Sequence, residues 1–362
     1  MVIQALLLCR CRGERDEEMG KELSHIICAE QTVEKLAGSV GGGFLSLLRD
    51  YSPAYHFGAI VADTFFYAVR LPSESGPSLC WGDMIHGAEG NDTSGPVHEM
   101  LKALRDSPND TLYGEKAAFV CGFLTHIALD SILHPYVYYV SGNYYDENPV
   151  ARRESQARHR LVESWLDLHL LEQSSQRLAR CTYLSKIRGK GALNRQLMRF
   201  LFTACEKSFQ IDPDSWRFLL RGYRVQMILN AAFRRSALGK SLCLVDRLLS
   251  GRLQSFLALF YPWGYSEVPE EIVNFRSYRH PVTGDVQDGG FESLWKQSLE
   301  RSEEFLTAVE KYLFLGMADD ELRKAIRGYS LSTGLEGVPT REAVHYDPIP
   351  LERLWLHCKH RG

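Results

Sequence analysis

The sequence predicts an all-α protein, and three observations lead to that class. Most long segments repeat apolar residues at intervals of three and four, the period of a helix with one buried face. Alternation of apolar and polar residues, which is typical of strands, is scarce. With 45% apolar and 24% charged residues in a chain of 362, the composition is that of a globular protein with a large core, built as one domain or as two smaller ones.

The first helical segment is SHIICAEQTVEKLA, residues 24–37, in which Ser24 is placed to cap the first turn. The other segments with a helical period are residues 115–134, 155–180, 192–208, 214–236 and 289–314. Stretches rich in glycine, proline and polar residues separate them, at 38–44, 71–78, 141–149 and 280–290. We therefore expect four parts: a disordered N-terminal extension (1–20), a main helical domain (21–250), a helical C-terminal elaboration packed on it (251–328) and an irregular tail (329–362).

Charge and cysteine usage exclude several classes of protein. A formal charge of −3 and a pI near 6.5 give no overall electrostatic footprint for nucleic acid or for an anionic membrane, so we expect no nucleic-acid partner. No apolar run approaches the roughly 20 residues that a transmembrane helix needs. The first twenty residues lack the charge pattern and cleavage site of a signal peptide, and translation beginning at Met19 is an alternative. The nine cysteines are scattered without a CxxC pair, which favours free thiols and a cytoplasmic location.

The stretch GFLTHIALDSILHPY, residues 122–136, places three metal-binding side chains four residues apart in an apolar segment: His126, Asp130 and His134. On a helix they share one face and span about 12 Å. A zinc ion with bonds of about 2 Å can take His126 together with Asp130, but it cannot also hold His134. The spacing therefore predicts a row of metal ions. Pro135 disfavours helical geometry at the preceding residue, so we expect the helix to end near His134.

Other segments supply partners for this row. RHRLVESWLDLHL places His159 and Glu163 one helical turn apart, and GDMIHG delivers His86 from a loop bracketed by glycines. GAIVAD delivers Asp63 inside an apolar stretch, where an unpaired carboxylate is costly. His25 lies in the first predicted helix. Imidazole and carboxylate ligands suit zinc, and they also accept iron or manganese.

In this order, the motifs SHxxxAE, GAIVAD, GDMIHG, GFLTHIALDSILHPY and HRLVE resemble the zinc-dependent phospholipase C family over roughly residues 22–170. The resemblance implies a multi-helix domain of the phospholipase C and single-strand-nuclease type that holds two or three Zn²⁺ ions. It assigns to one pair of ions the ligands His25, His86, His126 and Asp130, with Asp130 as the bridge. It assigns to a third ion the ligands His134, His159 and Glu163. Asp63 would lie beside the pair, as the general base or as a further ligand.

Two features set the chain apart from secreted members of that family. Those enzymes use the amine and carbonyl of a processed N-terminal tryptophan as ligands, whereas His25 here follows an extension without a signal peptide. The position nearest His25 therefore lacks two ligands. The interval of four between Asp130 and His134 is shorter than in the secreted enzymes and resembles that of a divergent intracellular branch.

The activity that the resemblance implies is hydrolysis of a phosphoester. Bound metal ions would polarise the phosphoryl oxygens and lower the pKa of a bound water toward ~7, and Asp63 would accept or orient its proton. The substrate would be a phospholipid, met through transient membrane contact, or a small phosphodiester.

Other interpretations compete with this one. The three side chains of the opening stretch can form a polar seam in a helical core, His159 and Glu163 an exposed ion pair, and Asp63 a helix cap. His25 and His86 can be ordinary histidines, and Asp167 is a solvated acid or a support for the ligands. Among functions, the main rival is a non-catalytic scaffold stabilised by metal. An HD-type phosphohydrolase needs an adjacent His-Asp pair, which is absent. A di-iron bundle needs paired ExxH motifs on helices, and the second such motif lies among prolines. A single-strand nuclease is disfavoured by the acidic charge balance.

Overall fold

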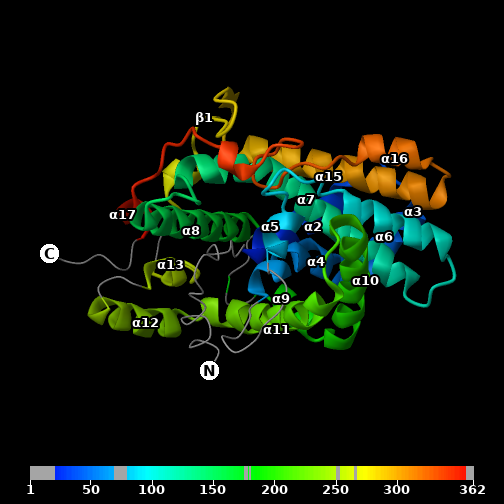
Figure 1. Cartoon of the computed structure of the whole chain (residues 1–362), viewed down its shortest axis with the longest axis horizontal. Coiled ribbons are helices and arrows are strands. Elements are labelled where there is room, and N and C mark those ends of the chain that lie inside the picture. Colours follow the sequence, from blue (N-terminus) through cyan, green and yellow to red (C-terminus); the bar gives the residue numbers. More distant parts are fainter. Residues whose placement is uncertain are drawn as a thin grey trace.

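Helices dominate the protein, and α2, α4 and α7 lie at its centre (Figure 1). The computed structural model describes residues 21–68, 80–174, 178, 181–249, 253–264 and 267–355. The predicted N-terminal extension and the predicted break at 71–78 lie outside these residues. In Figure 1, α15 and α16 run along one edge of the molecule, and α9, α11 and α12 run along the opposite edge. The prediction of an all-α fold is confirmed.

The α-helices of the first part of the chain are α2 (Glu22–Lys35), α3 (Gly42–Asp50), α4 (Ser52–Val61), α5 (Trp81–Ile85), α6 (Gly95–Asp106), α7 (Tyr113–Ser141), α8 (Pro149–Gln173), α9 (Tyr183–Arg188) and α10 (Gly191–Phe209). Those of the second part are α11 (Trp216–Phe233), α12 (Ser236–Leu248), α13 (Gln254–Leu257), α14 (Glu270–Val273), α15 (Phe291–Phe314), α16 (Asp319–Ala325) and α17 (Leu351–Leu354). Short 3₁₀ helices are η1 (Ala62–Tyr67), η3 (Pro213–Ser215) and η4 (Thr340–Glu342). The described strands, β1 (Ser277–Arg279) and β2 (Val286–Asp288), form one antiparallel hairpin.

The core is organised around α7, which packs against α2, α4, α6, α8 and α15. It meets α4 at two glycines, because a Cβ atom on Gly58 would lie 2.1 Å from the carbonyl oxygen of Phe119. A Cβ atom on Gly122 would lie 1.9 Å from that of Tyr55. Only glycine permits backbones to approach so closely. This approach brings the last turn of α4 and the following η1 against the middle of α7.

The end of α7 differs from the prediction. The helix does not stop near His134 but continues through Pro135 to Ser141. Pro135 removes the hydrogen bond that the carbonyl of Ser131 would accept within the helix. Gly334 packs directly on that carbonyl, since a Cβ there would lie 2.4 Å from the oxygen. The helix therefore keeps His134 on the same face as the ligands before it.

One helix in the described part of the chain, α7, is long and apolar enough to cross a membrane by length and composition. Length and composition alone are weak evidence, because the core helix of a globular protein passes the same test. Of the apolar window in α7, 94% is buried inside the protein. The helix also carries three polar side chains of the predicted site.

Some helix boundaries and caps differ from those predicted from the sequence. The helix predicted over 155–180 begins at Pro149, where the side chain of Asn148 caps it, and ends at Gln173. Ser24 is not the N-cap of α2: it lies inside the first turn, and Lys21 occupies the cap position. The buried carboxylate of Asp167 on α8 accepts hydrogen bonds from the backbone amides of Ser24 (2.7 Å) and Leu23 (3.3 Å). A side chain from another helix thus caps α2, a contact that local sequence does not reveal.

Residues after α16 run along the loop that carries His86. The amide of Leu331 donates to the carbonyl of His86 (2.8 Å), and the amide of Thr340 donates to that of Ala88 (2.8 Å). Further on, the amide of Asp347 donates to the carbonyl of Tyr139 at the end of α7 (2.8 Å). Residues 329–355 contain only η4 and α17 as helices. The predicted division of the chain after 250 and 328 stays a prediction.

Candidate metal centre

Two of the predicted ligands are oriented by backbone carbonyls. The Nδ1 atom of His126 lies 2.9 Å from the carbonyl oxygen of Ala59 on α4, and the Nδ1 atom of His86 lies 2.8 Å from that of Gly82 on α5. A carbonyl only accepts, so each Nδ1 carries a proton, and Nε2 is the atom left on each ring to bind a metal ion. The two Nε2 atoms face each other at 3.4 Å. Hydrogen bonding of one imidazole nitrogen in this way is typical of histidines that bind a metal through the other.

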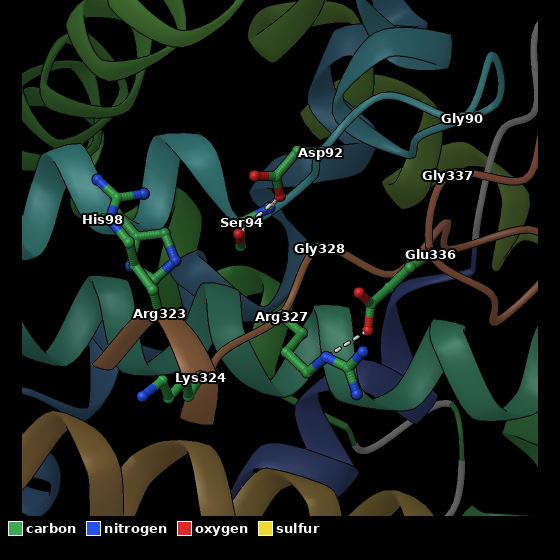
Figure 2. A pocket seen from close by; sticks show the side chains of 10 residues that line it. All are labelled: Gly90, Asp92, Ser94, His98, Arg323, Lys324, Arg327, Gly328, Glu336 and Gly337. Carbon is green, nitrogen blue, oxygen red and sulfur yellow. Dashed lines mark hydrogen bonds and ion pairs between the residues drawn. The ribbon is translucent and has the colours of Figure 1, made fainter. Parts of the chain in front are cut away.

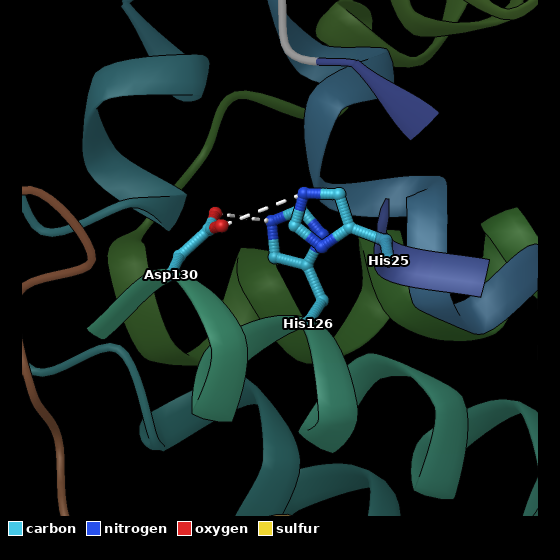
Figure 3. Close-up of side chains that lie close together, drawn as sticks. All are labelled: His25, His126 and Asp130. Carbon is cyan, nitrogen blue, oxygen red and sulfur yellow. Dashed lines mark ion pairs between the residues drawn. The ribbon is translucent and has the colours of Figure 1, made fainter. Parts of the chain in front are cut away.

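The first ligand group joins α2 and α7 and consists of His25, His126 and Asp130 (Figure 3). The two imidazole rings stack with centroids 4.0 Å apart and planes 12° apart, and both turn an edge toward the carboxylate. His25 Nε2 lies 3.4 Å from Asp130 Oδ1, and His126 Nε2 lies 3.0 Å from Asp130 Oδ2. All three side chains are buried.

The second group shares His126 and adds Asp63 and His86. Asp63 lies in η1, directly after α4, and its Oδ1 atom is 3.3 Å from His86 Nε2 and 3.9 Å from His126 Nε2. Its Oδ2 atom is buried, and no polar atom of the described residues hydrogen-bonds to it. The helix-cap interpretation of Asp63 finds no support, because no side-chain cap is present at η1.

The third group consists of His134 on α7 with His159 and Glu163 on α8. Glu163 Oε1 lies 3.4 Å from the Nε2 atoms of both histidines. His159 is buried, so the interpretation of His159 and Glu163 as an exposed ion pair is wrong. With 11% and 9% of their side chains exposed, Glu163 and His134 are the most accessible of the eight predicted ligands. This group is therefore the part of the centre closest to solvent.

The distances within the groups match those around a tetrahedral zinc ion. Two ligand atoms about 2.05 Å from one such ion lie about 3.3 Å apart. Five of the contacts between Nε2 atoms and between Nε2 and carboxylate atoms measure 3.3 or 3.4 Å. Zinc fits the donor set as well, since imidazole nitrogen and carboxylate oxygen are both ordinary zinc ligands.

Asp130 connects the three groups. Its Oδ1 atom lies 3.4 Å from His25 Nε2 and 3.5 Å from His134 Nε2, while Oδ2 faces His126. A single Nε2 atom has one lone pair, so His126 can serve only one of its two groups at a time. If it serves the group with Asp63 and His86, the position at His25 retains only His25 and Asp130 from the protein. The structure thus brings together all eight site residues predicted from the sequence. The three groups do not have equal numbers of ligands, because His126 cannot serve two of them at once.

Burial and mutual charge set the protonation of the ligands before any ion binds. Burial lowers the pKa of His25 to about 4, and the neighbouring His126 acts in the same direction. Burial also lowers the pKa of His126, but Asp130 and Asp63 outweigh it and raise the value to about 9. Burial raises the pKa of Glu163, whereas His159 and His134 bring it down to about 2. Glu163 is therefore charged and ready to bind a cation at neutral pH, whereas His126 holds a proton that a bound metal ion would displace.

The structure adds two adjacent buried ionisable residues that the sequence motifs did not include. Lys21 and Glu22 begin α2 and are 3% and 2% exposed. The Nζ atom of Lys21 donates to the carbonyl of Leu259, and Glu22 accepts a hydrogen bond from Asn230 on α11. Burial and the charge of Asp63 raise the pKa of Glu22 to about 8. The position of Glu22 three residues before His25, on the same helical face, was the available signal.

Asp167 is neither solvated nor a ligand of the three groups. It is fully buried, and it receives the hydroxyl of Tyr261 (2.5 Å) as well as the α2 amides. It therefore fixes the start of the helix that carries His25.

A separate cavity of about 750 Å³ lies where the loop after His86 ends (Figure 2). Asp92, His98, Arg323 and Arg327 are among the residues that line it, and none of the eight predicted ligands does. Two of the lining residues, Glu336 and Arg327, form an ion pair in which Oε1 lies 2.5 Å from Nε. The cavity is thus distinct from the ligand groups.

The fold and the site define a helical protein whose central helix joins three adjacent clusters of imidazole and carboxylate side chains, each of which could hold a metal ion. The family model for zinc dependent phospholipase C matches residues 24–208, just over half of the chain. No curated protein and no solved structure matches it. The chain belongs to the zinc-dependent phospholipase C family, as the motifs predicted.

Proposed function

We propose that the protein is a metal-dependent hydrolase of phosphodiesters, with a phospholipid or a smaller phosphodiester as substrate. The observation that carries this proposal is the buried row of three ligand groups, whose atoms are spaced as ligands of zinc. Bound ions would polarise the phosphoryl oxygens and lower the pKa of a water molecule at the centre. Membership of the zinc-dependent phospholipase C family supports the same activity.

The chain's own residues supply the remaining parts of the reaction. Asp63 Oδ2, unpartnered among the described residues, is placed to accept the proton of the attacking water. In the third group, His134, His159 and Glu163 would hold an ion on the accessible side of the centre, and that ion would bind an oxygen of the substrate. Attack on phosphorus breaks the bond to the departing alcohol, which takes up a proton, and a phosphorylated headgroup is released.

Asp63→Asn tests the proposal. The amide retains one oxygen toward His86 but removes the negative charge and the proton acceptor, so hydrolysis should fall by about two to four orders of magnitude. Metal content, measured by elemental analysis of the purified protein, should stay largely intact. The matched control is Asp83→Asn, since Asp83 is near the same loop and belongs to no ligand group.

The same measurements test the rival function, a scaffold stabilised by metal. Wild-type protein that contains its metal but hydrolyses no member of a panel of lipid and soluble phosphodiesters would favour the scaffold. If Asp63→Asn hydrolysed the substrate as fast as the wild type does, Asp63 would not be the proton acceptor of the reaction.

We also propose that the protein works in a reducing compartment, as its cysteines suggested. The six cysteines that the structure describes carry free thiols, and burial raises the pKa of Cys28 to about 12. A thiol as buried and protonated as that of Cys28 is unreactive, whereas Cys80 is exposed.

A further inference from the structure

The solvent face of α12 ends in a cluster of exposed apolar side chains. Leu244, Val245, Leu248 and Leu249 are 63%, 45%, 86% and 41% exposed. Other exposed large apolar residues in the described part of the chain occur singly or in pairs: Tyr51, Val150, Ile228, Val286, Phe314, Leu315 and Val344. Four such side chains within six positions form a continuous patch, which a protein rarely leaves open to water. We call these four residues the α12 patch.

The α12 patch is not needed to close the core. The opposite face of α12 already packs, through buried Cys243 and half-buried Leu238 and Leu242, into a cluster with Phe233 of α11 and Leu257 of α13. The helix is therefore apolar on both sides at its C-terminal end. One side holds the helix to the protein, and the other remains without a partner among the described residues.

Basic residues are concentrated in α11 and α12. Residues 216–249 contain seven Arg and Lys residues and one acidic residue, Asp246, a net charge of +6 in a chain whose total is −3. The lone Asp246 is engaged, because its carboxylate accepts the amide of Leu253 at 2.7 Å. Arg217, Arg224 and Ile228 follow one another at intervals of seven and four, and all three are exposed on one face of α11. The low overall charge thus conceals a strongly basic segment.

Helix contacts connect α12 with the metal centre. α12 packs against α11 and α13, and α13 packs against α8, the helix that carries His159 and Glu163. In Figure 1, α11 and α12 run along one edge of the molecule and α8 lies inward of them. Two residues of the third ligand group, the most accessible of the three groups, are therefore on a helix that α13 alone separates from α12.

We infer that the solvent face of α12, together with the basic face of α11, docks on an anionic phospholipid surface. Apolar side chains beside arginine and lysine are the composition of a helix that lies in a membrane interface. The leucines would enter the boundary between headgroups and acyl chains, while the cations meet the anionic headgroups. A second copy of the chain fits less well, because it would bring two segments of charge +6 together. The inference rests on the proposed function for its choice of a lipid partner.

Vesicle binding tests the inference with the full chain. Sedimentation with vesicles of phosphatidylcholine and phosphatidylserine in equal parts should recover the wild-type protein, and recovery should fall as salt is added. Leu244→Ser combined with Leu248→Ser should weaken binding by about tenfold or more. The control combines Leu315→Ser with Val344→Ser, which are 68% and 66% exposed elsewhere, and should bind as the wild type does. Arg224→Glu should reduce binding to these vesicles but not to phosphatidylcholine alone.

Hydrolysis of a soluble short-chain phosphodiester, measured in parallel, separates this inference from the proposed function. The variant at 244 and 248 should keep that activity and lose hydrolysis of vesicle lipid. An inactive wild type that still binds vesicles would contradict the proposed function alone. Equal binding by both double variants, or no binding by the wild type, would overturn the docking surface. So would a change of oligomeric state confined to the variant at 244 and 248, since it would assign the patch to a second copy.

Discussion

Asp130 shows how one residue decides what the centre can hold. Its two oxygens face histidines of all three ligand groups, at 3.0 to 3.5 Å. Burial raises the pKa of Asp130, but His134, His126 and His25 overcome that effect and hold it far below its usual range. The carboxylate is therefore charged in the folded protein at any ordinary pH. A buried charge of this kind is stable only beside cations or protonated imidazoles.

The raised pKa of Glu22 predicts how the stability of the protein changes with pH. Burial and Asp63 raise its pKa from 4.5 to about 8, so the folded protein keeps a proton that the unfolded chain releases near pH 4.5. Glu22 thus contributes stability that is complete below about 4.5 and is lost as the pH rises toward 8. Glu22→Gln removes this dependence. Relative to the wild type, the variant should gain stability with rising pH by at most about 1.4 kcal/mol per unit, the limit for one proton.

Urea unfolding of chelator-treated protein at several pH values measures this difference. Glu292→Gln, an exposed carboxylate on α15, serves as the control and should show no trend. Parallel stability curves for wild type and Glu22→Gln between pH 5 and 8 would contradict the raised pKa.

At the scale of elements, the contact between α4 and α7 positions the centre. Gly58 and Gly122 let the two backbones touch, and the carbonyl of Ala59 then reaches His126 Nδ1. Asp63 follows four residues further on, in η1 directly after α4. Helix packing and ligand geometry therefore depend on the same two small residues.

Gly122→Ala should damage both stability and metal binding. The new Cβ would meet the carbonyl oxygen of Tyr55 at 1.9 Å, and backbone atoms cannot move aside as side chains can. We expect a loss of about 1–3 kcal/mol in the free energy of unfolding, the usual cost of overpacking. The matched control is Gly43→Ala in α3, where a Cβ meets no atom within 4 Å and helix propensity improves. Denaturant unfolding measures the stability and elemental analysis measures the metal content. Unchanged metal content in Gly122→Ala would show that metal binding does not depend on the packing of α4 against α7.

At the scale of the whole molecule, α7 and α8 hold different parts of the centre, and metal content should reflect this. His126→Ala removes the histidine that the first and second groups share, whereas His159→Ala removes a ligand of the third group. The first variant should therefore lose more metal per chain than the second. The control is His169→Ala, ten residues after His159 on α8, whose ring contacts Glu292 instead.

Elemental analysis of the three proteins decides between one shared site and several separate ones. Equal loss in His126→Ala and His159→Ala would mean that the groups bind metal as a unit. Full retention in both would contradict the metal centre itself.

The local sequence pattern was sufficient to predict many residues of the site and the helices that carry them. Apolar residues at intervals of three and four predicted helices, and His126, Asp130 and His134 fell on one face because the helical repeat is a local property. The nature of the ligands followed from side-chain chemistry, which does not depend on the fold. The motif order also led to the family that the comparison then showed.

Other features depended on contacts between residues far apart in the chain. Pro135 favours a helix end by its own geometry, yet packing by Gly334, almost two hundred residues later, accompanies the continuation of α7. Ser24 has the chemistry of an N-cap, but Asp167 of α8 caps the helix instead. The sequence by itself determined the helical class and the chemistry of the ligands, because both are set by neighbouring residues. Only the tertiary structure decided which nitrogen faces which carboxylate, and which apolar face stayed exposed, because those are set by how distant helices pack.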